Sequence, residues 1–145
     1  MTEPIKITDQ LSVSKQISLA DVAALAKAGY GAVINNRPDG EVPKELDHEA
    51  VEAEAKKQGL GYAYLPIVAA AVTRKDVHEF ENLVLRQDKP ILAYCQSGRR
   101  CYLMYALTRV LSEGASPLAL VAEAATKGYD LRDLPMLAER LQAER

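Results

Sequence analysis

The sequence predicts a single-domain α/β protein with a mainly parallel central sheet flanked by helices. Short apolar runs, typical of buried strands, alternate with longer segments that carry helix-capping residues and apolar side chains at helical spacing. A strand, a helix and a second strand in succession usually place both strands parallel in one sheet, so this alternation favours a parallel arrangement. The length of 145 residues suits one core, and the domain is therefore expected to span residues 1–145.

The N-terminal half of the chain contains short strands and two helices. Apolar runs bounded by polar residues or glycine predict strands at 5–7, 11–14, 32–34 and 62–66. The first helix is expected to begin at Ser18, because a serine followed three residues later by an acid, Asp21, forms a capping box, and to end at Gly29. The second helix, 47–58, is very polar and ends before Gly59.

The C-terminal half is mostly helical. Thr73 and Asp76 repeat the spacing of the capping box and start a third helix. The serine-proline pair at 116–117 is typical of a helix start, and Gly128 is typical of a helix end. The remaining elements are expected to be a strand at 90–94 and helices at 100–112, 116–128 and from 133 onward.

Composition and charge exclude several classes of function. A formal net charge of −2 gives no electrostatic reason for binding nucleic acid. No apolar run approaches the ~20 residues that cross a bilayer, so no membrane contact is expected. The N-terminus lacks a signal-peptide pattern and the cysteines number two, which favours a cytoplasmic protein with reduced thiols. His48 and His78 lie in charged, helix-like stretches, so neither a metal nor a cofactor is expected.

Three loops follow predicted strands directly. They cover residues 35–40, 67–72 and 95–100. Because ligands of open α/β sheets bind beyond the carboxyl ends of the strands, these loops are expected to meet at one site.

The loop at 95–100 carries the reactive chemistry. It joins a strand to a helix, where backbone N–H groups lack helical partners and the helix dipole adds positive potential. Gly98 permits the backbone angles of such an anion-binding loop, and Arg100 supplies a two-pronged donor for an oxyanion. Cys95, surrounded in this way, is expected to be an ionised nucleophile. The residues expected to bind the anion are Gln96, Ser97, Gly98 and Arg99.

The neighbouring polar residues support the site in this interpretation. Asn35 is expected to brace the cysteine loop by hydrogen bonds, and Arg37 either contacts the substrate or pairs with Asp39. The same stretch also has the composition of a simple turn. Cys101 packs as a small residue under the loop, hydrogen-bonds the Cys95 thiolate weakly, or resolves an oxidised or persulfidated Cys95 as a disulfide.

Five segments of the chain resemble the beta-lactamase-hydrolase-like phosphatase family, the DUF442 domain. They are LSVSKQIS, INNRPDGE, YAYLPIV, LAYCQSGRR and GYDL. The resemblance implies a fold similar to protein tyrosine and dual-specificity phosphatases. It also implies relatives fused to sulfur-metabolising metallo-hydrolases.

The spacing of the cysteine loop separates two reactions. Tyrosine and dual-specificity phosphatases place arginine six positions after the cysteine, where this chain has Cys101, whereas Arg100 is five positions after Cys95. Rhodanese-type sulfurtransferases have the shorter loop, although Gln96 replaces their usual arginine. Dual-specificity phosphatases also carry an aspartate general acid where this chain has the apolar stretch 68–72, and Asp39 is the best substitute.

We therefore favour a sulfurtransferase from the sequence. Cys95 takes a sulfur atom from a small anionic donor such as thiosulfate and passes the resulting persulfide to a thiol acceptor. A phosphatase acting on a phosphate ester through a Cys95 phospho-intermediate is the alternative, with Asp39 as proton donor. A non-catalytic thiol sensor of oxidants or persulfides is the second alternative.

Overall fold

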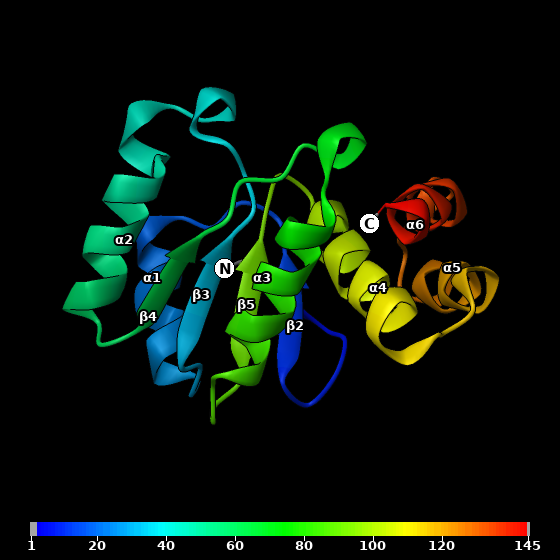
Figure 1. Cartoon of the computed structure of the whole chain (residues 1–145). Helices are drawn as coiled ribbons and strands as arrows, with labels where there is room; N and C mark the ends of the chain where they lie inside the picture. The colour runs from blue at the N-terminus through cyan, green and yellow to red at the C-terminus, as the bar shows by residue number, and fades with distance from the viewer. Residues whose placement is uncertain (1–2, 145) are drawn as a thin grey trace.

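The computed structural model describes residues 3–144 and places a five-stranded sheet between two layers of helices (Figure 1). The spatial order of the strands is β1-β2-β5-β3-β4. Only β1 is antiparallel to its neighbour, and the other pairs are parallel. The strands are β1 (Ile5–Lys6), β2 (Leu11–Ser14), β3 (Ala32–Asn35), β4 (Gly61–Tyr64) and β5 (Ile91–Tyr94). The α/β architecture with a mainly parallel sheet is confirmed.

Helices cover both faces of the sheet. Figure 1 shows α1 (Leu19–Lys27) and α2 (His48–Lys57) on one side and α3 (Arg74–Leu85) and α4 (Arg99–Glu113) on the other. Two further helices, α5 (Pro117–Thr126) and α6 (Leu134–Ala143), pack on α4 away from the sheet. Within residues 3–144, we find no helix with the length and apolarity that a membrane span requires.

The core consists of two layers divided by the sheet. Successive side chains of a strand point to opposite faces, so Val33 and Leu92 pack with α1 and α2, whereas Ile34 and Ala93 pack with α3 and α4. Because both faces of the central strands are buried, these strands are continuous apolar runs in the sequence. The strand β5 lies in the middle of the sheet, and its carboxyl end is therefore a rigid platform.

Local signals place the helix starts well. Ser18 and Thr73 each accept a hydrogen bond from the backbone of an aspartate three residues on, and each aspartate bonds back to the cap. Both capping boxes predicted from the sequence are thus confirmed. The structure adds short 3₁₀ turns at Asp39–Glu41 and Lys44–Leu46, between β3 and α2, and at Ala69–Ala71, within the predicted loop 67–72.

Candidate active site

Cys95 lies directly after β5, at the point where the chain turns into α4. Its side chain is buried, at 1% exposure, and its Sγ accepts a hydrogen bond of 3.1 Å from the backbone N–H of Gly98. Backbone groups of Ser97 and Cys101 also hydrogen-bond this sulfur, as does the Cys101 thiol. The sulfur therefore lies in a cradle of donors at the N-terminus of a helix.

These donors keep Cys95 ionised. The hydrogen bond from the Cys101 thiol is the largest cause, and with the backbone donors it outweighs burial and lowers the pKa of Cys95 to about 5. Burial raises the pKa of Cys101 well above its ordinary value, and the nearby Cys95 sulfur adds to that effect. At neutral pH the pair therefore consists of one thiolate, Cys95, and one thiol that donates to it.

The pH dependence of alkylation tests this ionisation. Because only the thiolate reacts, the rate at which iodoacetamide modifies Cys95 is expected to fall as pH drops through about 5. An ordinary thiol has its midpoint near about 8.5, which is the value expected after unfolding in denaturant. The measurement is the mass of the Cys95 peptide after timed alkylation. A midpoint above pH 8 in the folded protein would contradict the cradle.

The loop closes tightly because Gly98 adopts a left-handed conformation, with φ of +95°. A Cβ at this position would overlap the hydroxyl group of Tyr129. That hydroxyl donates a hydrogen bond of 3.1 Å to the carbonyl oxygen of Ser97. Tyr129 thus braces the cysteine loop from the segment between α5 and α6. No local pattern assigns it this role, although it lies in the GYDL segment.

Alanine at Gly98 is expected to destabilise the protein more than alanine at Gly114. Both glycines have positive φ, +95° and +69°, so both substitutions introduce backbone strain of about 1 kcal/mol. Only Gly98 also meets a side chain, Tyr129, whereas nothing lies within 4 Å of a Cβ at Gly114. Overpacking is expected to raise the total for Gly98→Ala to about 3 kcal/mol. Denaturant titration measures the free energy of unfolding of both variants. Equal losses of stability would show that the Tyr129 side chain moves away from the new methyl group at little cost.

The Arg100 guanidinium is held in place by three acceptor oxygens. Its Nη1 donates to Glu41 Oε2 at 2.8 Å and to the carbonyl oxygen of Ile67 at 3.0 Å, and its Nη2 donates to Glu41 Oε1 at 2.6 Å. The hydrogen bond with Glu41 is the largest cause that raises the pKa of Arg100, and the nearby Cys95 thiolate raises it further. An arginine fixed in this way has its fork oriented before any anion arrives.

Glu41 lies at the site and is not among the residues expected there from the sequence. It lies one residue beyond the polar loop 35–40 and accepts from both Arg100 and Arg37. The hydrogen bond from Arg100 is the first cause that lowers the pKa of Glu41, so it is a carboxylate at neutral pH. Arg37 pairs with Glu41 and with Gln16 Oε1. Arg37 therefore does not pair with Asp39, and the prediction of that ion pair is wrong.

Asp39 is engaged elsewhere. Its carboxylate accepts hydrogen bonds from the backbone N–H and the Nδ1 of His48, whose ring stacks on Tyr64 at 4.3 Å. Burial acts to raise the pKa of Asp39, but the bonds from His48 lower it overall. This geometry does not fit the expected role of Asp39 as proton donor. The carboxylate is ionised and accepts two hydrogen bonds from His48, so it holds no proton to donate.

Asn35 does not face the anion-binding loop. Its Nδ2 donates to the hydroxyl oxygen of Tyr62 at 2.9 Å, and its Oδ1 accepts from the backbone N–H of Arg37 at 2.8 Å. The side chain is buried and shapes the turn after β3. Asn36, also buried, donates to the carbonyl oxygen of Leu65 and ties this turn to the end of β4.

An open depression of about 340 Å³ lies over the cysteine loop. It brings together residues from two of the three predicted loops, 67–72 and 95–100, and Glu41, which directly follows the third. The lining residues are Glu41, Val68, Ala69, Gln96, Ser97, Arg99 and Arg100. The Arg99 guanidinium turns to Asp133 and to the carbonyl oxygen of Asp130, so its charge is already paired. Arg100 is ion-paired as well, with Glu41, and its charge also interacts with that of Cys95.

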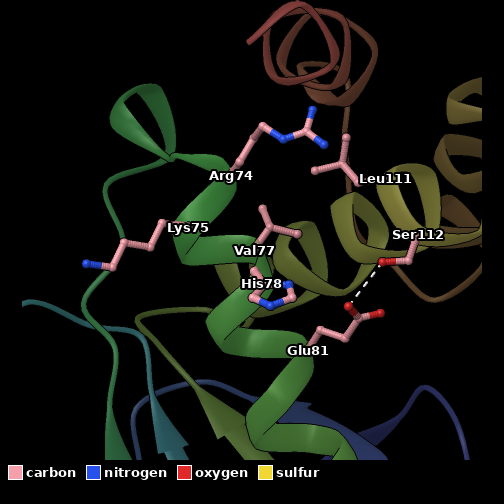
Figure 2. Close-up of a pocket in the computed structure, with 7 residues that line it drawn as sticks. All are labelled: Arg74, Lys75, Val77, His78, Glu81, Leu111 and Ser112. Atoms are coloured by element: carbon pink, nitrogen blue, oxygen red, sulfur yellow. Dashed lines mark hydrogen bonds between the residues drawn. The ribbon is translucent and has the colours of Figure 1, made fainter. Parts of the chain in front are cut away.

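A second depression of about 330 Å³ lies between α3 and α4, away from the cysteine (Figure 2). Figure 2 shows Lys75 pointing away from it and Ser112 bonded to Glu81. Arg74 donates to the carbonyl oxygen of Leu141, at the end of α6. The residues that line this second depression include no cysteine. Both cysteines of the described chain lie at the cysteine loop and the helix that follows it.

Comparison with known proteins agrees with this geometry. The family model described as the phosphatase-like domain of beta-lactamase hydrolase-like protein matches residues 5–112. A beta-lactamase hydrolase-like protein of Xylella fastidiosa is 30% identical over 127 residues, which are 88% of this chain. A relative of the same description from Agrobacterium fabrum is 27% identical over 139 residues. The chain spans 30% and 32% of the length of these relatives.

Solved structures share the fold. A candidate phosphatase from Neisseria meningitidis has a TM-score of 0.80 and 29% identity, covering 92% of this chain and 94% of the other. A cysteine-to-serine variant of TpbA from P. aeruginosa, solved in complex with pTyr, has a TM-score of 0.64 and 16% identity, with 97% and 91% coverage. The second likeness is one of fold alone.

Proposed function

Because the chain belongs to the family of the phosphatase-like domain of beta-lactamase hydrolase-like proteins, we propose that it is a cysteine-dependent phosphatase. The single observation that carries the proposal is an ionised Cys95 sulfur in a cradle of amide donors, close enough to Arg100 for the two charges to interact. The sulfurtransferase favoured from the sequence has weaker support, since the relatives and the neighbouring folds are phosphatase-like.

The cradle suits attack on phosphorus. The Cys95 thiolate forms a bond to phosphorus while the bond from phosphorus to the leaving oxygen breaks. The backbone N–H groups of the loop and the Arg100 fork hold the negative oxygens of the transferred group during this step. Water then breaks the bond between sulfur and phosphorus, which releases phosphate and restores the thiolate.

The short loop does not argue against this reaction. Arg100 follows Cys95 by five positions rather than six, which in the sequence favours sulfur transfer. In the fold, α4 begins at Arg99, and Arg100 reaches Cys95 from the first turn of the helix. The position of the guanidinium, which is the quantity that matters for anion binding, is thus compatible with either anion.

The proposed substrates are aryl phosphate monoesters, of which phosphotyrosine is one. Among the described residues that line the depression, the only acid is Glu41, and its ion pairs keep it ionised. Without a proton donor, the leaving oxygen must carry its negative charge itself, which phenols do far better than aliphatic alcohols. The distant fold neighbour TpbA was solved with pTyr, and this supports the same class.

Glu41 is proposed as a positioning residue for Arg100. Glu41→Gln is expected to lower kcat/KM for aryl phosphates by about tenfold, chiefly by raising KM, because the guanidinium loses its charged anchor. Steady-state kinetics measure the split between KM and kcat. The matched control is Glu113→Gln, which breaks the remote ion pair with Arg109 and is expected to change neither constant. A rise in kcat/KM on Glu41→Gln would mean that the carboxylate competes with substrate instead.

The test of the proposed function compares two donors. Purified protein is mixed with an aryl phosphate or with thiosulfate, quenched in acid and digested. The mass of the Cys95 peptide is then measured by mass spectrometry. We expect a phosphoryl adduct and continuous release of the phenol. A peptide that gains one sulfur atom from thiosulfate, with no hydrolysis of the aryl phosphate, would replace the proposal by the sulfurtransferase.

A further inference from the structure

The second cysteine, Cys101, touches the reactive sulfur. It is the third residue of α4, and a helical side chain leans toward the N-terminus of its helix, which here is the cysteine loop. The two side chains are hydrogen-bonded to each other, and both belong to the same buried cluster. A disulfide requires the two sulfurs to approach to the bond length of about 2.05 Å, and the two side chains are already neighbours in the core.

The environment assigns different parts to the two thiols. Gln96 and Ser97, which follow Cys95 in the sequence, line the open depression, and Cys95 itself is 1% exposed. Cys101 is fully buried, at 0% exposure. Because Cys95 is the thiolate and adjoins the lining of the depression, it is expected to react with an oxidant before Cys101 does. The sequence contains no third cysteine that could compete within the chain.

We propose that Cys95 and Cys101 form a redox pair that reacts with hydroperoxides, in which Cys101 resolves the oxidised Cys95 as a disulfide. In the first step the Cys95 sulfur attacks the terminal oxygen of the hydroperoxide. The O–O bond breaks, Cys95 becomes a sulfenic acid, and the departing alkoxide or hydroxide takes a proton from water. The sulfur loses two electrons and the peroxide gains them.

In the second step the Cys101 sulfur attacks the Cys95 sulfur. The S–S bond forms, the S–O bond breaks, and the leaving hydroxide accepts the proton of the Cys101 thiol to become water. An external dithiol then reduces the disulfide and is itself oxidised to a disulfide. The pair thereby protects Cys95 from the sulfinic acid, which thiols do not reverse.

Peptide mapping of the unaltered protein tests the proposal directly. Reduced protein is treated with hydrogen peroxide, quenched with an alkylating reagent and digested with trypsin. Trypsin cleaves after Arg99 and Arg100, which lie between the two cysteines, so the disulfide appears as two cross-linked peptides. We expect these peptides to disappear after dithiothreitol. Sulfinic acid at Cys95 with a free Cys101 thiol would overturn the proposal.

Two variants sharpen the result. In Cys101→Ala, and in the more conservative Cys101→Ser, reversibly oxidised Cys95 is expected to decrease at least about tenfold in favour of the sulfinic acid. Circular dichroism shows whether each variant is folded. If neither variant folds, the peptide mapping of the unaltered protein described above is the test. Equal recovery of Cys95 by dithiothreitol in both variants and the unaltered protein would overturn the resolving role. These masses are independent of phosphate turnover, so failure of the phosphatase proposal leaves this test intact.

Discussion

Replacement of Cys95 by serine is expected to lower kcat/KM for aryl phosphates by about 10⁴-fold or more, as loss of a catalytic nucleophile does in other covalent enzymes. The donors around position 95 ionise a thiol and bring its pKa to about 5. A serine hydroxyl is a far weaker acid than a thiol, so the same donors leave it protonated at neutral pH. Release of the phenol at saturating and subsaturating substrate measures the effect.

The comparison variant for this prediction is Cys101→Ser. It leaves the Cys95 thiolate in place and substitutes a hydroxyl donor for the thiol donor. We expect it to retain activity within about tenfold, since a hydroxyl also hydrogen-bonds a thiolate. Hydrolysis that survives in Cys95→Ser at the original rate would remove Cys95 from the mechanism.

Replacement of Arg100 by lysine is expected to lower kcat/KM by about 10²- to 10³-fold, the range seen when one donor to a developing anion is lost. The guanidinium bonds Glu41 and the carbonyl oxygen of Ile67 at once, and its charge interacts with that of Cys95. An ammonium group is a point charge without the planar fork, so it cannot keep this arrangement and also grip two oxygens of a phosphate. The loss is expected in kcat as well as KM, because the charge on these oxygens is held throughout the transfer.

The matched control for Arg100→Lys is Arg109→Lys on the same helix. Arg109 pairs with Glu113 and Tyr105 and is remote from the cysteine loop. Its replacement is expected to change kcat/KM by less than about twofold, as for a surface ion pair. If both lysine variants lost activity equally, the effect would reflect the stability of α4 and not the site.

Local patterns in the sequence were sufficient for most of the fold. The apolar runs of β3 and β5 and the capping boxes at Ser18 and Thr73 depend on residues a few positions apart, and the structure confirms them. The loop at 95–100 was equally readable, because glycine and arginine at fixed distances from a cysteine follow a strand and precede a helix. The phosphatase-like fold followed from the resemblance of short segments and is confirmed.

The partners of the site residues were not readable in the same way. Arg100 bonds Glu41, which is 59 positions away, and Tyr129 braces Ser97 across 32 positions. Asp39 looked like a proton donor because its loop follows a strand of the sheet, yet its carboxylate turns to His48, nine positions along the same loop and helix. Such pairings depend on where separate loops meet once the sheet has formed.

By itself, the sequence determined the alternation of strands and helices, the helix caps and a reactive thiol at the end of a central strand. These features arise from hydrophobic periodicity and backbone hydrogen bonding, which act between near neighbours. Only the tertiary structure decided that Glu41 anchors Arg100, that Asp39 pairs with His48, and that Cys101 donates to Cys95. The physical reason is that hydrogen bonds and ion pairs act over a few ångströms, and residues distant in sequence come that close only in the folded chain.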